Sequence, residues 1–310
     1  MGIGAVNQLH SIRWVHSGGT LTLSQLEDLS PGTGTEILSR RAAGTFYTQF
    51  AAVRQQMPEI VFRTPQLQSM FLNLVNFDQG FSKCVGASDL HYKALTDHGI
   101  ASTTGERIRM MQGMLYWETI SASHNGDATI VCRIVPTYDG TNAPLVSTSQ
   151  TVAGSSTAAE HFGMGPVVLN GSVIDGVIDV TIASNARILK KGTASEPWDR
   201  ACYLVELSPV ITIRTHDHDR WTTHGMTPTE ITASGSVGSG LEVYFRMKDD
   251  NGVNVSAVST VHPYVQMEGG LLYVDGSSGA NTDPPVVTLV AVGANAGTSS
   301  LDFSAGEAIP

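Results

Sequence analysis

The clearest hydrophobic pattern in the chain lies between residues 107 and 138. In its second part Ile130, Cys132 and Ile134 alternate with the residues of a second face, which is the period of a half-buried strand. Two β-rich runs flank Asn125-Gly126, and Asn-Gly tolerates the positive φ that a tight hairpin turn needs. We therefore expect a central antiparallel hairpin here.

One segment has the period of a helix instead. Its apolar residues recur at i, i+3, i+4 and i+7, which gives one apolar stripe: Leu67, Met70, Phe71 and Leu74. Thr64 can cap such a helix, and Pro65 suits its first position. A helix this short needs a sheet to pack on.

Three other segments are less regular. The run from Leu29 to Thr35 is rich in turn-forming residues and predicts a loop. The long stretch 76–105 is more polar and less regular, although its part from Asp89 to Leu95 fits a strand. The end of the chain, from Gly293 to Pro310, predicts a mobile tail.

An internal repeat runs through this pattern. Residues 36–65 align without gaps on residues 187–216, at a shift of 151, with 7 identities in 30 positions. The run that begins Gly113-Met114-Leu115-Tyr116 is echoed at a shift of 157 by Gly270-Leu271-Leu272-Tyr273. Two segments in the same order at nearly the same shift predict a tandem duplication. The alternative is that two β-rich halves share composition and short motifs.

The length of 310 residues also favours two domains. The repeat divides them into residues 1–158 and 159–310, with a stretch of small, linker-type residues from Gln150 onward at the division. Only 15% of residues are charged and 32 are glycine, which is typical of a β-rich soluble chain. We expect two β-sandwich or β-barrel domains, each with a short flanking helix.

Charge and cysteine usage exclude several classes of protein. The net charge of −10 argues against a surface that coats nucleic acid, which needs lysine and arginine to displace counterions. No apolar run is long enough to span a membrane, and residues 1–16 lack the pattern of a signal peptide, so we expect synthesis inside a cell. Three distant cysteines form no disulfide framework, and Cys132 is expected to be buried.

Candidate chemistry is confined to one histidine-rich segment. His216, His218 and His224 lie with two aspartates within nine residues and could bind a divalent metal. The same segment aligns with the start of the helix, so a polar helix N-terminus is the competing interpretation. No phosphate loop, nucleophile elbow or HExxH motif occurs, so we expect no catalytic residue and no cofactor.

The run from Gly113 through Ala128 to Leu145, followed by Gly165 to Ser172 and Val177 to Ile182, resembles tail tube (major tail) proteins of long-tailed phages. The resemblance covers about residues 107–215 and contains no catalytic motif. It implies a β-sandwich or β-barrel domain with one helix, assembling into stacked rings. In the duplicated variant three copies would form a pseudo-hexameric ring. The polar segment 216–224 departs from the helix expected there.

The resemblance also implies a function and partners. It implies a structural virion protein, made in the host cytoplasm, whose rings form a conduit for DNA during ejection. Its partners would be copies of itself, other tail proteins and double-stranded DNA in transient, non-specific passage, with no membrane insertion. Ring closure would pair sheet edges between subunits, and segment 76–105 could contact a neighbouring ring. Two alternatives stay open: a tail-tip, decoration or receptor-binding virion protein, and a metal-dependent enzyme.

Overall fold

The computed structural model describes residues 7–41, 43–44, 46–74, 77–95, 101–151, 159–193, 196–217, 234–237, 240–278, 286–294 and 300–310. Over these residues the chain has 24 strands and one helix, so the expected mainly β class is confirmed. The strands form one large sheet, two smaller sheets and two separate hairpins.

The largest sheet has ten strands. Nine follow in the order β19 (Ser234–Ser236), β22 (Gly270–Ser278), β23 (Val286–Gly293), β18 (Val210–Thr215), β15 (Val177–Ala183), β10 (Gly113–Ser123), β11 (Thr129–Pro136), β6 (Glu59–Thr64) and β3 (Asp28–Gly32), and β7 (Phe81–Cys84) pairs with the start of β10.

The two smaller sheets have five strands each. One has the order β12 (Val146–Thr151), β9 (Ala101–Met110), β8 (Ser88–Leu95), β1 (Asn7–His16) and β2 (Gly19–Leu23). The other has the order β14 (Ser172–Ile174), β13 (His161–Leu169), β20 (Leu241–Lys248), β21 (His262–Met267) and β24 (Asp302–Glu307). The separate hairpins are β4 (Thr35–Arg40) with β5 (Phe50–Gln56), and β16 (Arg187–Gly192) with β17 (Asp199–Glu206).

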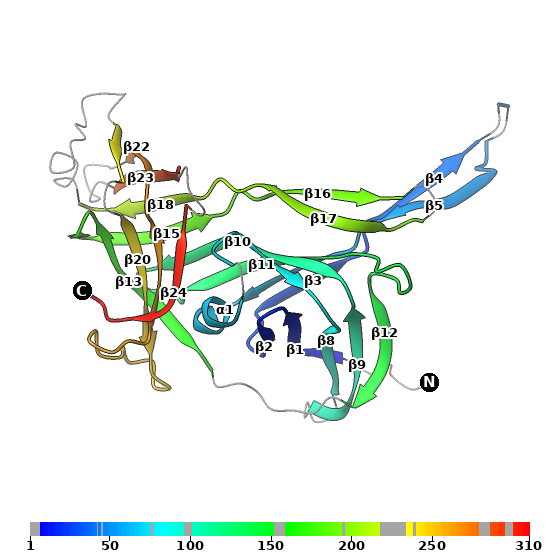
Figure 1. Cartoon of the computed structure of the whole chain (residues 1–310), viewed down its shortest axis with the longest axis horizontal. Helices are drawn as coiled ribbons and strands as arrows, with labels where there is room; N and C mark the ends of the chain where they lie inside the picture. Colours follow the sequence, from blue (N-terminus) through cyan, green and yellow to red (C-terminus); the bar gives the residue numbers. More distant parts are fainter. Residues whose placement is uncertain are drawn as a thin grey trace.

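The core lies between the large sheet and the two smaller ones. In Figure 1 strands β18, β15, β10 and β11 cross the upper part of the body, with β1, β2, β8 and β9 below at one end and β13, β20 and β24 at the other. Buried side chains from all three sheets form one cluster, which includes Trp14, Trp117, Ile213 and Phe245. A continuous core of this kind holds both ends of the molecule in one body.

The expected central hairpin is confirmed as β10 and β11, antiparallel and joined through the turn at residues 124–126. The side chains of Ile130, Cys132 and Ile134 are fully buried, as the alternation predicts.

The predicted helix is confirmed as α1 (Leu67–Asn73), but its predicted cap is wrong. Gln66 precedes the helix and makes no side-chain cap, while the Thr64 hydroxyl donates to the Gln25 carbonyl. The first free N–H groups, from Gln68 and Ser69, instead donate to the carboxylate of Glu160 at 3.0 and 3.2 Å. The cap therefore comes from a residue 92 positions away, which local sequence cannot indicate.

Two other sequence expectations are wrong. The predicted loop at Leu29–Thr35 contains strand β3, an end strand of the large sheet, where a proline is tolerated. The predicted mobile tail contains strand β24, which pairs with β21. Phe303 in β24 packs edge-on against Phe71 of α1, with ring centroids 4.9 Å apart. Packing of this ring against Phe71, Phe77 and Trp117 explains why residues 300–310 lie against the body although the sequence of the tail is rich in small residues.

The strand order in the first half recurs in the second. In the large sheet β3-β6-β11-β10, with β7 beside β10, corresponds to β15-β18-β23-β22, with β19 beside β22. The five-stranded sheets correspond in the same way, β12-β9-β8-β1-β2 to β24-β21-β20-β13-β14. The two separate hairpins, β4–β5 and β16–β17, complete the correspondence.

The register of the pairing recurs as well. The pair Ile130–Thr64 has its counterpart in Val287–Thr215, so the shifts of 157 and 151 seen in the sequence hold in the sheet. Each hairpin opens on a glycine, Gly113 or Gly270, at which a Cβ would collide with a carbonyl oxygen of the partner strand. This is the geometry expected of two copies of one unit. Duplication as its origin stays a prediction, and the division falls at residues 152–158, outside the described residues.

Candidate functional site

The histidine segment is only partly described. His216 is exposed at the end of β18, while His218 and His224 lie outside the described residues. Among the residues that the structure describes, no group of three His, Cys, Asp or Glu side chains could hold a metal ion. The helix that the repeat would place at 216–223 also falls largely outside the described ranges.

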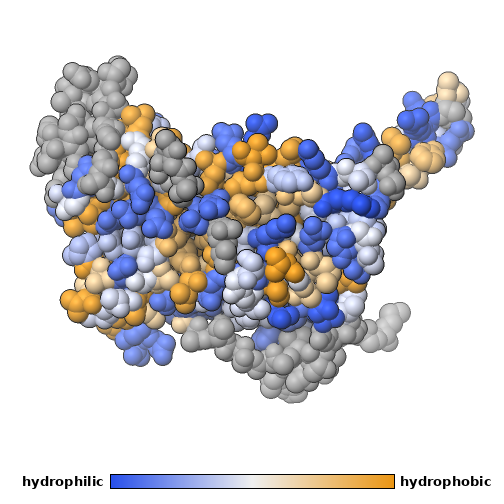
Figure 2. Space-filling view, viewed as in Figure 1, coloured by the Kyte–Doolittle hydropathy of each residue, from blue (hydrophilic) through white to orange (hydrophobic). Residues whose placement is uncertain are grey.

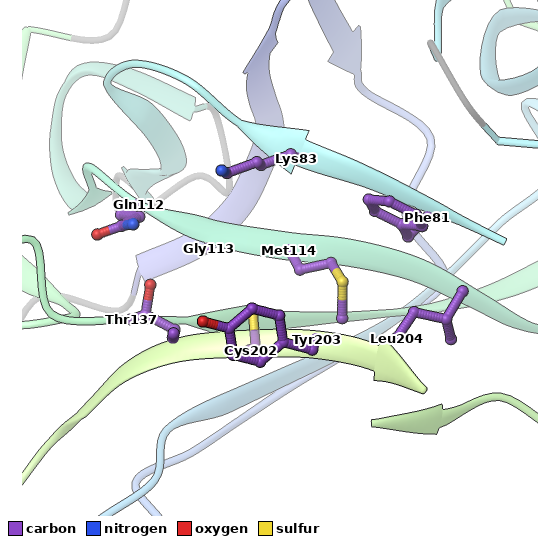
Figure 3. Close-up of a pocket in the computed structure, with 10 residues that line it drawn as sticks. Phe81, Lys83, Gln112, Gly113, Met114, Thr137, Cys202, Tyr203 and Leu204 are labelled. Carbon is purple, nitrogen blue, oxygen red and sulfur yellow. The ribbon is translucent and has the colours of Figure 1, made fainter. Parts of the chain in front are cut away.

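A pocket of about 420 Å³ lies between β17 on one side and β7 and β10 on the other. Figure 3 shows Phe81, Met114 and Leu204 at its apolar end and Lys83, Gln112 and Thr137 at its polar end. Cys202 lines it too, but burial raises the pKa of this thiol to about 11 even though Lys190 and Lys83 oppose the shift. The thiol is therefore protonated at neutral pH and is a poor nucleophile.

A second arrangement has the residue types of a hydrolase but not the geometry. The Ser11 hydroxyl lies 3.3 Å from Nδ1 of His91. Ser11 is buried. The carboxylate of Asp89, which lies on the same strand as His91, is bound by arginines and does not orient the His91 imidazole. This carboxylate lies 2.8 Å from Arg109 and within ion-pair distance of Arg13 and Arg107. The cluster neutralises a buried charge, which is a structural role.

A third arrangement is the contact between the two halves of the chain, which we call the inner joint. It has two parts, a strand pairing and a hairpin that packs on the sheet. Strand β15 of the second half pairs with β10 of the first over five residues, from Thr119 to Ser123. Within this pairing Ile120 lies opposite Ile182, and both side chains are fully buried. The inner joint thus continues one sheet through both halves.

The second part of the inner joint is the β16–β17 hairpin. It lies across the outer face of β10 and β11, where its Ile188 and Leu204 pack in a separate apolar cluster with Met114, Tyr116 and Val135. This is the face of the sheet opposite to the main core. The hairpin therefore buries a face that the sheet alone would expose to solvent.

Charged groups reinforce this contact. Glu59 of β6 accepts from Arg133 and from Lys190 of β16, and Arg133 also donates to Glu118 at 2.7 Å. Partial burial opposes the ionisation of Glu59, but the hydrogen bonds from Lys190 and Arg133 outweigh it and hold the pKa of Glu59 below its ordinary value. Partial burial likewise opposes the charge of Arg133, yet Glu118 and Glu59 raise its pKa. The four side chains tie the second half to the first.

The tip of the same hairpin touches the base of the other one. The Trp198 indole N–H donates to the side-chain oxygen of Gln56 at 2.9 Å, and the Gln56 N–H donates to the Pro197 carbonyl at 2.6 Å. The Trp198 ring lies 5.2 Å from that of Tyr138. The two hairpins therefore follow each other end to end, as Figure 1 shows along the top of the molecule.

The β4–β5 hairpin, which we call the arm, lies on no sheet face of the described residues. Figure 1 shows it projecting from the body, and Figure 2 shows apolar and polar surface on it. Its exposed large apolar side chains are Ile37, Phe46, Tyr47, Phe50 and Val53. At the opposite end of the molecule β22 presents Leu271, which is 48% exposed.

No sequence expectation singles out the arm, although the sequence carries a signal for it. Residues 36–65 carry the ungapped repeat match, and this match covers the arm except for Thr35. Strand β4 has the pattern of an ordinary strand, so only the position of the hairpin relative to the sheets shows that it projects.

The described residues include no helix that could cross a membrane. No protein-family model matches the chain, and the search of curated proteins gives no match to it.

Proposed function

We propose that the chain is a structural subunit that assembles with copies of itself into rings, and that these rings stack into the tail tube of a long-tailed phage. In this proposal a ring contains three copies, each supplying two similar units, and the tube conducts DNA during ejection. The subunit has no catalytic residue or cofactor and works in the virion tail, in contact with other tail proteins.

One observation carries the proposal: counterparts of the two strands that pair at the inner joint lie at the two edges of the large sheet, β3 at one edge and the part of β22 that β19 leaves uncovered at the other. The inner joint pairs β15 with the second part of β10. By the recurring register β3 is the counterpart of β15, and β22 is the counterpart of β10. Strand β3 ends the sheet on one side, and β19 covers only the first part of β22 on the other, from Leu271 to Tyr273. A second copy could therefore continue the sheet by the same pairing, which repeats until a ring closes.

The charge of the chain is compatible with this role. A ring of three copies would carry about three times the net charge of −10. A wall poor in lysine and arginine does not bind phosphates by counterion release, so passing DNA would not be retained.

Negative-stain electron microscopy of the purified protein over a concentration series tests the proposal. Tubes or stacked rings with threefold or pseudo-sixfold end views are the expected result. If assemblies form without stacking, or with another symmetry, the tail tube proposal fails. A tail-tip, decoration or receptor-binding role would then be the better hypothesis, and binding to host-surface glycans would be the next measurement.

A further inference from the structure

We infer that the β4–β5 arm of one copy docks on the outer face of β22 and β23 of the next copy, in the way that β16–β17 docks within the chain. The occupant of that face is thus a second copy of this chain. The inference rests on the proposed self-assembly and names the surface that carries it.

The inner joint supplies the template. Ile188 and Leu204 are paired with each other across the β16–β17 hairpin, and both reach the face formed by β10 and β11. Their counterparts in the arm, at a shift of 151, are Ile37 and Val53, which are likewise paired with each other. The arm therefore presents the same type of apolar pair in the same register.

The apolar pair of the arm is more exposed than the corresponding pair of β16–β17, as expected if the arm docks on another copy. Ile37 is 66% exposed and Val53 is 49% exposed. Their counterparts Ile188 and Leu204 are half-buried, and they gain that burial from the face on which the hairpin lies. Together with Phe46, Tyr47 and Phe50 they make five exposed large apolar side chains on one hairpin, and a group of this kind is typical of a contact surface.

The receiving face shows the same difference. Met114 and Val135 are 3% and 2% exposed beneath the inner hairpin. Their counterparts at a shift of 157 are Leu271, which is 48% exposed, and Val292, which is half-buried. Tyr273 is the counterpart of Tyr116 and completes the same apolar triangle. The exposed face of β22 and β23 therefore lies at one end of the molecule, and the exposed arm projects at the other (Figure 1).

The end-to-end arrangement of hairpins gives a second point of contact. Trp198 at the inner tip meets Gln56 at the base of the arm. The counterparts of these two positions are Tyr47 at the tip of the arm and Leu207 at the base of β17. An arm docked by the template would carry its tip to the base of the next copy's hairpin, so the hairpins would form a continuous band around the assembly.

Three of the four members of the charged network have no charged counterpart at the outer contact, and only Glu118 has one, Asp275. The positions that correspond to Lys190, Glu59 and Arg133 are occupied by Ser39, Val210 and Val290. Docking therefore depends on apolar burial, and no ion pair of the inner network has a counterpart between copies. Because each copy carries a net charge of −10, added salt screens repulsion between copies, and association is expected to strengthen as salt rises.

The contact is heterologous, since arm and face are different surfaces of one chain. This makes complementary variants informative. Val53→Glu damages the arm and leaves the face intact, while Leu271→Glu damages the face and leaves the arm intact. Val258→Glu is the matched control, because Val258 is 80% exposed in the segment between β20 and β21 and belongs to neither surface.

Sedimentation velocity over a concentration series, on full-length chains, tests the inference. The wild type and Val258→Glu are expected to form assemblies of more than two copies. Each of the other two variants is expected to lose association by at least about tenfold, because a charge would be buried in an apolar contact. An equal mixture of these two variants should form dimers and nothing larger, since only one intact arm and one intact face remain to meet. Thermal unfolding at a concentration at which the wild type is also unassembled should be the same for all chains, which would show that the variants are folded.

Three results would overturn the inference: assembly of Val53→Glu and Leu271→Glu like the wild type, dimers formed by each variant alone, or a wild type that stays monomeric at every concentration. The tail tube proposal is judged separately by electron microscopy. Rings that the variants abolish but that never stack would support the docking and contradict the tube. Tubes that form in all variants would support the tube and contradict the docking.

Discussion

The inner joint and its outer counterpart use the same backbone plan with different side chains. The inner joint has Ile120 opposite Ile182, the apolar cluster under β16–β17, and the charged network around Glu59. At the sheet edges where a second copy would pair, Ser277 of β22 corresponds to Ile120, and Pro31 of β3 corresponds to Ile182. Proline has no N–H to donate to a neighbouring strand, so the outer sheet edge offers fewer hydrogen bonds.

This difference separates a permanent contact from a conditional one. Within one chain the two halves are held at high effective concentration, so the inner joint can include charged groups that need an exact environment. Between chains an edge blunted by proline and serine resists pairing with unrelated strands. Such an edge leaves the apolar arm to select the partner, which is a reason to expect that assembly depends on Ile37 and Val53 more than on β3.

The largest contrast is expected between Ile120 in the inner joint and its counterpart Ser277. Ile120→Ala removes a fully buried side chain and should lower the free energy of unfolding by about 2–5 kcal/mol. Ser277→Ala at the counterpart position is expected to change it by less than about 0.5 kcal/mol in the unassembled chain. Urea unfolding of the two variants, followed by circular dichroism, measures both. Equal losses would show that the two positions are not in different environments.

Breaking the charged network should have a smaller effect. Arg133→Met leaves Glu59 and Glu118 half-buried without their shared partner and should cost about 1–3 kcal/mol of unfolding free energy. The double variant Arg133→Met with Glu59→Gln should cost less than the sum of the single changes, because the two residues interact directly. Additive losses in the same urea experiment would contradict a coupled network.

Acid should weaken the inner joint through the same carboxylate. The pKa of Glu59 is lower in the folded chain than its ordinary value of 4.5, so its contribution to stability is present above that value. The contribution is lost as the pH falls through the folded pKa. The stability difference between wild type and Glu59→Gln should therefore be constant near neutral pH and shrink below about pH 4.5. Unfolding curves between pH 7 and pH 3 measure it, and a difference that does not change with pH would contradict the assignment.

The smallest effect on the single chain is expected in the arm. Val53→Glu should change the unfolding free energy of the unassembled chain by less than about 0.5 kcal/mol, because Val53 is already half exposed to solvent. The matched change at the inner joint, Leu204→Glu, should cost more, since Leu204 packs against Met114 and Tyr116. If the two changes cost the same, arm and inner hairpin do not differ in burial.

Several elements could be predicted from the sequence because their causes are local. The alternation from Ile130 to Ile134 and the turn at Asn125-Gly126 indicate the central hairpin, and the stripe from Leu67 to Leu74 indicates the helix. The gapless match at residues 36–65 indicates two similar units, and the register of the sheet follows the same shifts. Period and turn chemistry act between near neighbours, so they are visible along the chain.

Other features depend on residues far apart in the chain, and only the tertiary structure decided them. Glu160 caps α1 from the second half, β24 is ordered by the packing of Phe303, and β3 becomes a strand because β6 lies beside it. The sequence also gives β4–β5 and β16–β17 similar patterns, yet one lies on a sheet and the other projects. The reason is that a hairpin is buried or exposed according to which face lies within its reach. Among the described residues β16–β17 packs on β10 and β11, with Phe81 of β7 beside them, whereas β4–β5 projects away from the sheets.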